Sequence, residues 1–172
     1  PLAMANTFKK LTALLIITTS ITGCGSGQNA ATRNIKQVTD GVEGQSNEIK
    51  LRNVLIVKTA DSQGVLVATL VNTSDESDSI VGISIGGAMT NYAAKSSELI
   101  KNKPIIFVGD SANADAFIAG LSKNAGDRIG VTFTFTKAAP LTLDALIVNG
   151  EGIYQDLVRS APDIIAPATP AP

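Results

Sequence analysis

One pattern in the sequence is typical of a catalytic serine. Gly82-Ile-Ser-Ile-Gly86 matches the G-x-S-x-G turn, whose serine attacks a substrate while a histidine accepts the serine proton. Histidine is absent from all 172 residues, so a serine–histidine–acid triad cannot be assembled. A pairing of Ser84 with Lys95 or Lys101 stays formally open, although no spacing motif supports it. The alternation of apolar and polar residues around Ser84 instead predicts that it lies on the polar face of a strand.

Carboxylate and amide oxygens gather in two places where a cation could bind. Asp75, Glu76 and Asp78 crowd one polar turn, which is shorter than a calcium loop of about 12 residues and is expected to be solvated. The second group consists of Asp110, Asn113 and Asp115. If a cation binds there, Ca²⁺ or Mg²⁺ suits these oxygens better than copper. The sequence predicts no cofactor.

A glycine-containing segment, 86–92, is a candidate docking loop for a partner. It combines a flexible start with the thioether of Met89, the amide of Asn91 and the phenol of Tyr92. Such loops at the end of a β-sandwich often carry binding residues. The alternative is that Met89 and Tyr92 pack onto the core, and the sequence does not decide between the two. Asn72-Thr-Ser74 has the form of a glycosylation sequon, but its residues are equally typical of a turn.

The first 24 residues have the order expected of a secretory signal. Lys9 and Lys10 precede an apolar stretch, 11–21, that as a helix would span roughly 17 Å against a hydrocarbon core of about 30 Å. It is too short for a stable transmembrane anchor. The tetrad Ile21-Thr22-Gly23-Cys24 resembles the lipobox of bacterial lipoproteins. That resemblance implies cleavage before Cys24 and diacylation of its sulfur.

Cys24 is the only cysteine, so no disulfide can form within the chain. Two acyl chains are generally enough for lasting membrane attachment. We therefore expect a protein held by Cys24 on the extracytoplasmic face of a bacterial membrane. Removal of residues 1–23 takes away two lysines and no acid, which gives a formal net charge of −3. Because that charge repels phosphates and no basic cluster is present, nucleic acid is not an expected partner.

Composition divides the chain into four parts. Residues 1–23 are expected to form the signal peptide. Residues 1–3 precede Met4 and show no feature of a signal peptide. Residues 24–45 are rich in small and polar types and are expected to form a tether. Residues 46–150 should form the folded domain. Residues 151–172 hold four of the seven prolines and should form an extended tail.

The expected domain has the pattern of a sheet protein. The clearest strand, 129–136, alternates apolar residues with glycine and threonine, and 141–148 should return beside it after the Lys137–Pro140 turn. A second hairpin is predicted from 48–58 and 65–72, with 65–71 central because it is apolar on both faces. Strands are also expected at 80–85 and 105–108, and helical signals at 91–99 and 112–121 are weak. These elements indicate an all-β, antiparallel sandwich.

The order of these segments resembles a known family. The segments 49–57, 64–72 and 80–84 are similar to the opening of actinobacterial lipoproteins of the LpqE type, which are in turn similar to periplasmic copper chaperones of the PCu(A)C family. The close of that pattern is matched by Gly120-Leu121, Gly126-Asp127 and the strand that follows. The resemblance covers 48–149 and implies a cupredoxin-like, immunoglobulin-like Greek-key sandwich.

The resemblance also implies a copper site, and there the sequence departs from the family. The family binds Cu(I) through histidine and methionine, which are soft ligands suited to that ion. Its His-x-Met positions fall at Asp115 and Phe117, and Met89 lies in the region of its first methionine. One thioether cannot hold Cu(I) alone. We therefore expect a non-enzymatic module that binds a cell-envelope protein or glycan, with a divergent copper-chaperone-like metal site as the alternative.

Overall fold

The computed structural model describes residues 40–59 and 61–155, and this part of the chain is almost entirely β-structure. Its single helical element is one short 3-10 helix, η2 (Gly152–Tyr154). The strands are β1 (Val42–Ser46), β2 (Ile49–Lys58), β3 (Gly64–Asn72), β4 (Asp78–Ile85), β5 (Ala88–Met89), β6 (Asn91–Ala94), β7 (Glu98–Leu99), β8 (Ile105–Ile106), β9 (Ala114–Ile118), β10 (Arg128–Phe135) and β11 (Leu141–Asn149).

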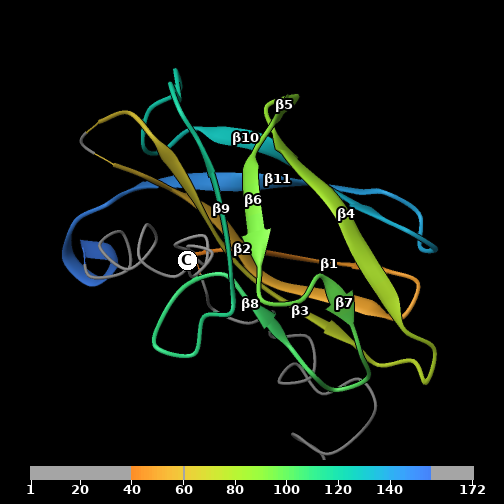
Figure 1. Ribbon diagram of the computed structural model, residues 1–172. Helices are drawn as coiled ribbons and strands as arrows, with labels where there is room; N and C mark the ends of the chain where they lie inside the picture. Colours follow the sequence, from red (N-terminus) through yellow and green to blue (C-terminus); the bar gives the residue numbers. More distant parts are fainter. Residues whose placement is uncertain (1–39, 60, 156–172) are drawn as a thin grey trace, which may run out of the picture. The chain divides into compact units, whose positions relative to one another are not determined.

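The strands form one strongly curved sheet (Figure 1). Its main path runs β5-β4-β10-β11-β2-β3-β9-β6, with β1, β7 and β8 pairing with β2, β4 and β3 beside it. The two ends of this path, β5 and β6, are separated in sequence by Thr90 alone, so the sheet must fold back on itself. The predicted all-β sandwich is confirmed. Its pairs are antiparallel except for β11 and β2, which run parallel.

The two predicted hairpins are present. β10 pairs with β11 from Arg128–Leu146 to Phe133–Leu141, and Thr132 and Thr142 share a hydrogen bond of 2.8 Å on the outer face. β2 pairs with β3 from Ile49–Asn72 to Lys58–Gly64, with a bulge between Arg52 and Leu55. β3 also pairs with β8 and β9, which confirms that it is a central strand.

Three local predictions differ from the structure. The weak helical signal at 91–99 is wrong, because these residues form β6 and β7. The ambiguous stretch 112–121 contains β9. Only Ile105 and Ile106 of the predicted strand 105–108 pair as β8. Each of these strands has five residues or fewer, so its alternation is too brief to be read from the sequence.

The main core lies between the two layers of the curved sheet. Phe107 and Phe133 are its largest fully buried side chains, and aliphatic residues from both layers surround them. A second apolar cluster lies on another face of β2 and β3 and consists of Leu55, Val57, Val65 and Val67. Alternation explains this division, because β2 and β3 are apolar on both faces here. The bulge in β2 changes which of its residues face the main core, from Ile49 and Leu51 before it to Val54 and Ile56 after it.

The ordered domain extends beyond both expected boundaries. β1 begins at Val42, inside the predicted tether, and pairs with β2. At the other end Tyr154 packs against the second apolar cluster, and its hydroxyl donates to Asp40 Oδ2 at 2.5 Å. Ile21, Thr22, Gly23 and the predicted acylation site Cys24 lie outside the described residues. In the part that is described, no helix is long and apolar enough to cross a membrane.

Candidate functional site

The outward face of β9 carries the most unusual side chain of the domain, Asp115. Strand β9 alternates, with Ala114 and Ala116 in the main core and Phe117 packed against the second apolar cluster. Asp115 therefore faces outward on the same side as Phe117. β9 and β6 lie side by side in the sheet (Figure 1). Their antiparallel pairing places Ala93 directly opposite Asp115.

Asp115 is a buried carboxyl group without a full set of partners. The residue is only 7% exposed, and its Oδ1 atom is buried with no hydrogen-bond donor. Burial raises the pKa of Asp115 above its usual value of 3.8, because the charged form is poorly solvated there. Buried polar atoms are nearly always paired in folded proteins. An unpaired carboxyl oxygen therefore marks a candidate binding position.

The residues around Asp115 differ from one another in chemistry. Phe117 offers an aromatic ring two residues along the same face, and it is half-buried. Ala93 opposite Asp115 contributes a single methyl group, and Asn91 lies opposite Phe117 and is exposed. β6 ends the main path of the sheet, so no main-path strand covers its outer edge. The face thus carries a carboxyl group, an aromatic ring and an amide, next to the strand that ends the main path of the sheet.

The other predicted metal ligands are not gathered around Asp115. Both polar atoms of the Asn113 side chain close a loop: Oδ1 accepts the Ile106 N–H at 2.8 Å, and Nδ2 donates to the Pro104 carbonyl at 3.0 Å. Asp110 is exposed on the turn before β9. Across the described ranges, no three His, Cys, Asp or Glu side chains form a cluster that could hold a metal ion.

Met89 is the only soft ligand in the described domain, and it lies on another strand. It belongs to β5, is 70% exposed, and pairs with Ser84 of β4. A Cβ atom added to Gly82 would come within 2.9 Å of the Met89 methyl group, so Met89 lies over that glycine. A carboxylate, a phenylalanine and a thioether on another strand are not the His and Met set that suits Cu(I). The described residues therefore lack the pair of soft ligands that the resemblance implies.

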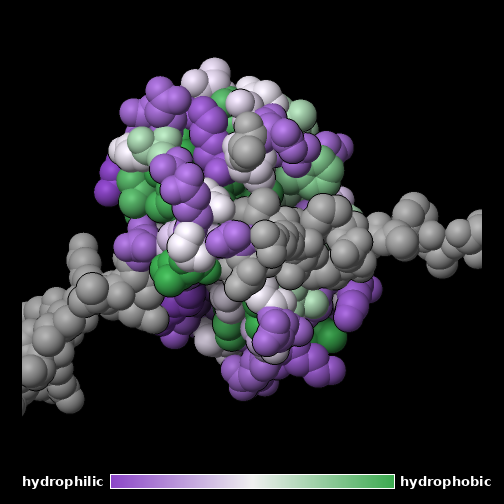
Figure 2. All heavy atoms as spheres, turned by 90° about the vertical axis from the view of Figure 1, so that its left-hand side faces the viewer, coloured by the Kyte–Doolittle hydropathy of each residue, from purple (hydrophilic) through white to green (hydrophobic). Residues whose placement is uncertain are grey.

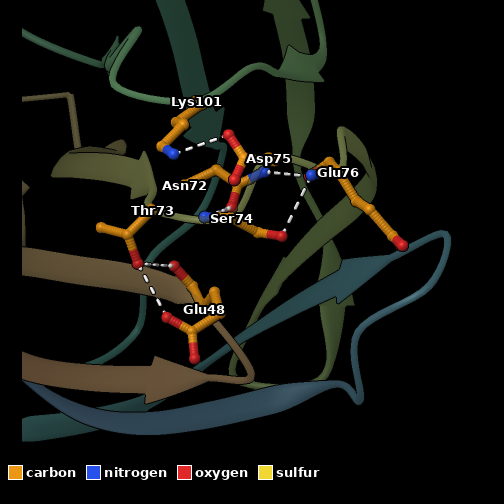
Figure 3. Close-up of polar contacts among 7 residues, drawn as sticks. All are labelled: Glu48, Asn72, Thr73, Ser74, Asp75, Glu76 and Lys101. Atoms are coloured by element: carbon orange, nitrogen blue, oxygen red, sulfur yellow. Dashed lines mark hydrogen bonds and ion pairs between the residues drawn. The ribbon is translucent and has the colours of Figure 1, made fainter.

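The acidic turn 72–78 is held together by its own hydrogen bonds (Figure 3). The Asn72 side chain donates to the Glu76 and Leu99 carbonyls and accepts the Ser74 N–H. Asp75 forms an ion pair with Lys101 at 2.6 Å. Asn72 is only 1% exposed, so the sequon asparagine serves the turn.

Asp78 ends this turn and stabilises a second one. Its Oδ1 accepts the N–H groups of Ser79 and Lys137, and its Oδ2 accepts that of Ala138. Burial alone would raise the pKa of Asp78, but the backbone donors outweigh burial and hold the pKa below 3.8. A cleft of about 160 Å³ beside the turn is lined by Glu48, Glu76 and Lys137 among others. Since the Asp78 oxygens already have donors, the turn is structural.

The predicted docking loop divides into exposed and buried residues. Met89 and Asn91 are exposed. Tyr92 is half-buried against the main core, with its ring centroid 6.1 Å from that of Phe107 and its hydroxyl bonded to Ser97 Oγ at 3.1 Å. Burial raises the pKa of Tyr92 above 10.0. Of the alternatives left open by the sequence, packing on the core holds for Tyr92 and exposure holds for Met89.

Ser84 lies in the middle of β4 and not at a strand-to-helix turn. It pairs with Thr132 on one side and Met89 on the other, as its place on a polar strand face predicts.

On the side drawn in Figure 2, hydrophilic residues predominate and hydrophobic ones form small separate patches. The exposed large apolar side chains of the described domain are Val81, Met89 and Ile153.

Sequence reasoning named Asp115 as one oxygen ligand among several and as a position of the family's His-x-Met pair, but it missed the pairing with Ala93. The signal was present in residues 114–117, where alanine alternates with Asp115 and Phe117. An alternation of small and large residues indicates a strand with two different faces. The short length of β9 hid this pattern.

Comparison with known proteins identifies the class of fold. No family model and no curated protein matches the chain. Three similar solved structures are a copper-bound PCuAC domain from PmoF2 (18% identity, TM-score 0.51, 63% of this chain and 98% of that one), an apo PCuAC domain from PmoF1 (20%, 0.52, 63% and 99%) and an apo PCuAC domain from PmoF2 (17%, 0.51, 64% and 98%). The described domain therefore has a fold similar to that of PCuAC domains.

Proposed function

We propose that the chain is a bacterial lipoprotein whose PCuAC-like domain is attached to the extracytoplasmic face of the membrane and acts by binding. Attachment is through the acylated Cys24, as the signal-like first 23 residues and the lipobox-like tetrad suggest. The finer resemblance to LpqE-type lipoproteins agrees with this role. The partner is a component of the cell envelope, and nucleic acid is not a partner because the mature chain is acidic.

The face formed by β9 and β6 is the observation that carries the proposal. It presents the Asp115 carboxyl group, with its unpaired oxygen, beside Phe117. These are the positions where the resemblance places the soft copper ligands of the family. The PCuAC-like fold supplies the scaffold, and the side chains on this face supply a different recognition chemistry.

Catalysis is not part of the proposal. The chain has no histidine to act as a general base, and Ser84 is fixed within β4 between two paired strands. A fluorophosphonate probe should therefore leave Ser84 unlabelled. Labelling that is lost in Ser84→Ala would show a hydrolase and would overturn this part of the proposal.

A second candidate function is metal binding of the copper-chaperone kind. It is favoured by the similarity to a PCuAC domain that was solved with copper bound. In this chain Met89 would have to supply the soft ligand and Asp115 an oxygen. Met89→Leu and Asp115→Asn are the variants that would remove them.

Two measurements test the proposed function. Membrane fractions of a bacterium producing the full chain should hold the wild-type protein, and Cys24→Ala should release it from the membrane. Mass spectrometry should find acyl chains on the wild-type sulfur. A Cys24→Ala protein that stays on the membrane would contradict the anchor.

Calorimetric titration of the full chain with Cu(I) and with Ca²⁺ separates the two candidate functions. The leading proposal predicts no submicromolar binding of either ion. Submicromolar Cu(I) binding that is lost in Met89→Leu would establish the second candidate in its place. Ca²⁺ binding of that strength that is lost in Asp115→Asn would establish a hard-cation site.

A further inference from the structure

Asp115 has no cation within the described domain to balance its charge. The ion pairs found there join Arg52 to Glu43 and Lys101 to Asp75. Lys95 is the cation next to β6; its N–H donates to the Asn113 carbonyl at 2.8 Å, which places it diagonally across from Asp115. Its side chain is exposed and forms no ion pair with Asp115. The described residues therefore supply no cationic partner for the Asp115 carboxyl group.

The neighbours of Asp115 show which donor fits. Phe117 lies two residues along the same outward face and is half-buried against the second apolar cluster. A guanidinium group is planar, pairs with a carboxylate and stacks on an aromatic ring, whereas an ammonium group has no flat face to stack. Carboxylate and ring on one face therefore favour arginine over lysine.

The Asp115 Oδ1 atom is buried, so a donor from a partner reaches it only by displacing the side chains beside it. Ala93 is directly opposite and contributes one methyl group, and β6 is the last strand of the main sheet path. A side chain that approaches across β6 meets the outward residues Asn91, Ala93 and Lys95, of which Ala93, opposite Asp115, is the smallest. The formal charge of −3 on the mature chain favours the approach of a cationic partner.

We propose that Asp115 and Phe117 form a binding site for an arginine side chain of a partner protein. This inference rests on the proposed function, since it names the chemistry of the partner that the anchored domain binds. The guanidinium group donates to the unpaired Asp115 oxygen, and its plane lies against the Phe117 ring. The arginine stem passes over Ala93.

The test uses n-butylguanidinium as the probe and the full chain in detergent micelles. Binding is followed by NMR through the amide signals of Ala93 and Asp115. We expect saturable shifts of these two signals, and affinity at least tenfold lower in Asp115→Asn, because a charge-assisted hydrogen bond to the buried Oδ1 atom is lost. Phe117→Leu should weaken butylguanidinium while leaving the weaker binding of n-butylammonium unchanged. n-Butanol, which has the same stem and no charge, should cause no shift.

Three further variants decide where the cation binds. Ala93→Ile should weaken butylguanidinium by covering the carboxyl group opposite it, while Asp115 itself is kept. Lys95→Gln should not weaken binding, since it removes a positive charge that lies diagonally across from Asp115. Arg159, which lies outside the described residues, is the chain's own arginine after Tyr154. Arg159→Gln should leave the affinity for butylguanidinium unchanged. A clear gain of affinity would show that the Arg159 side chain occupies the binding site in the wild type, and would overturn the proposal of a partner protein.

Other outcomes also overturn the proposal. They are equal affinity of wild type and Asp115→Asn, or equal shifts with butylguanidinium and butanol. Dispersed amide spectra of each variant show that it is folded, so a loss of binding is not a loss of structure. Membrane attachment through Cys24 is measured separately. An anchored protein that binds no guanidinium would therefore contradict this inference and leave the proposed function standing.

Discussion

Replacing Asp78 with alanine should destabilise the domain, because its carboxylate accepts hydrogen bonds from the neighbouring Ser79 and from the distant turn at Lys137 and Ala138. Ser79 N donates to Oδ1 at 2.7 Å, Lys137 N to Oδ1 at 2.9 Å, and Ala138 N to Oδ2 at 2.8 Å. Ala138 is only 6% exposed, so water cannot easily take over its N–H. A buried donor left unpaired costs about 1–3 kcal/mol, and a hydrogen bond to a charged group contributes roughly 1.5–3 kcal/mol. Since water can reach the other two donors, we expect Asp78→Ala to lower the free energy of unfolding by about 2–4 kcal/mol.

The assay is urea unfolding of the full chain, followed by far-UV circular dichroism. Asp75→Ala is the matched control: it removes the same charge from the same turn, but the Asp75 side chain is 90% exposed and its ion pair with Lys101 should contribute less than about 1 kcal/mol. Because the folded-state pKa of Asp78 is below 3.8, its contribution is present above that pH and is lost as the pH falls through the lowered pKa. The gap between wild type and Asp78→Ala should therefore close in acid. Equal midpoints for the two variants at neutral pH would refute the reasoning.

Three further predictions concern the cores and the buried acid. Asp115→Leu should raise the midpoint of thermal unfolding at neutral pH, with the gain shrinking as the pH falls toward 3.8, because a raised folded-state pKa makes the charged form unfavourable in the native state. Tyr154→Phe should lower the free energy of unfolding in urea by up to about 1.5 kcal/mol. Burial and the hydrogen bond to Asp40 raise the pKa of Tyr154 to about 12, so the substitution should remove a tyrosine of that pKa from an ultraviolet titration. A titration curve that the substitution leaves unchanged would contradict this. Phe133→Ala should cost about 3–5 kcal/mol, since its side chain is fully buried, and a smaller loss would show that the core refills the cavity.

The long strands could be predicted from the sequence, because their alternation persists over many residues. β10 is the clearest example, with Ile129, Val131 and Phe133 buried and Thr132 turned outward. β3 was identified as central because both of its faces are apolar, and it pairs with strands on both sides. The parallel pairing of β11 with β2 joins residues far apart in the chain, and no local pattern indicates it.

The candidate site could be predicted only in part, since it depends on pairing between two short strands. β6 and β9 have four and five residues, and nothing local tells that Ala93 faces Asp115. The sequence grouped Asp115 with Asn113 by proximity, but alternation and loop closure give the two side chains different roles. Likewise Asp78 was grouped with Asp75 and Glu76, although its donors come from Lys137 and Ala138.

The protonation of Asp115 tests the central claim most directly, because that claim requires a carboxyl group without a partner in the chain. A carbon-13 NMR titration of the aspartate carboxyl signals in the full chain, assigned with Asp115→Asn, measures it. The account predicts a pKa above 3.8 in the free protein and a lower one when butylguanidinium is added, because a bound cation favours the charged form. A pKa at or below 3.8 in the free protein would show that Asp115 is already paired within the chain, and would contradict the account.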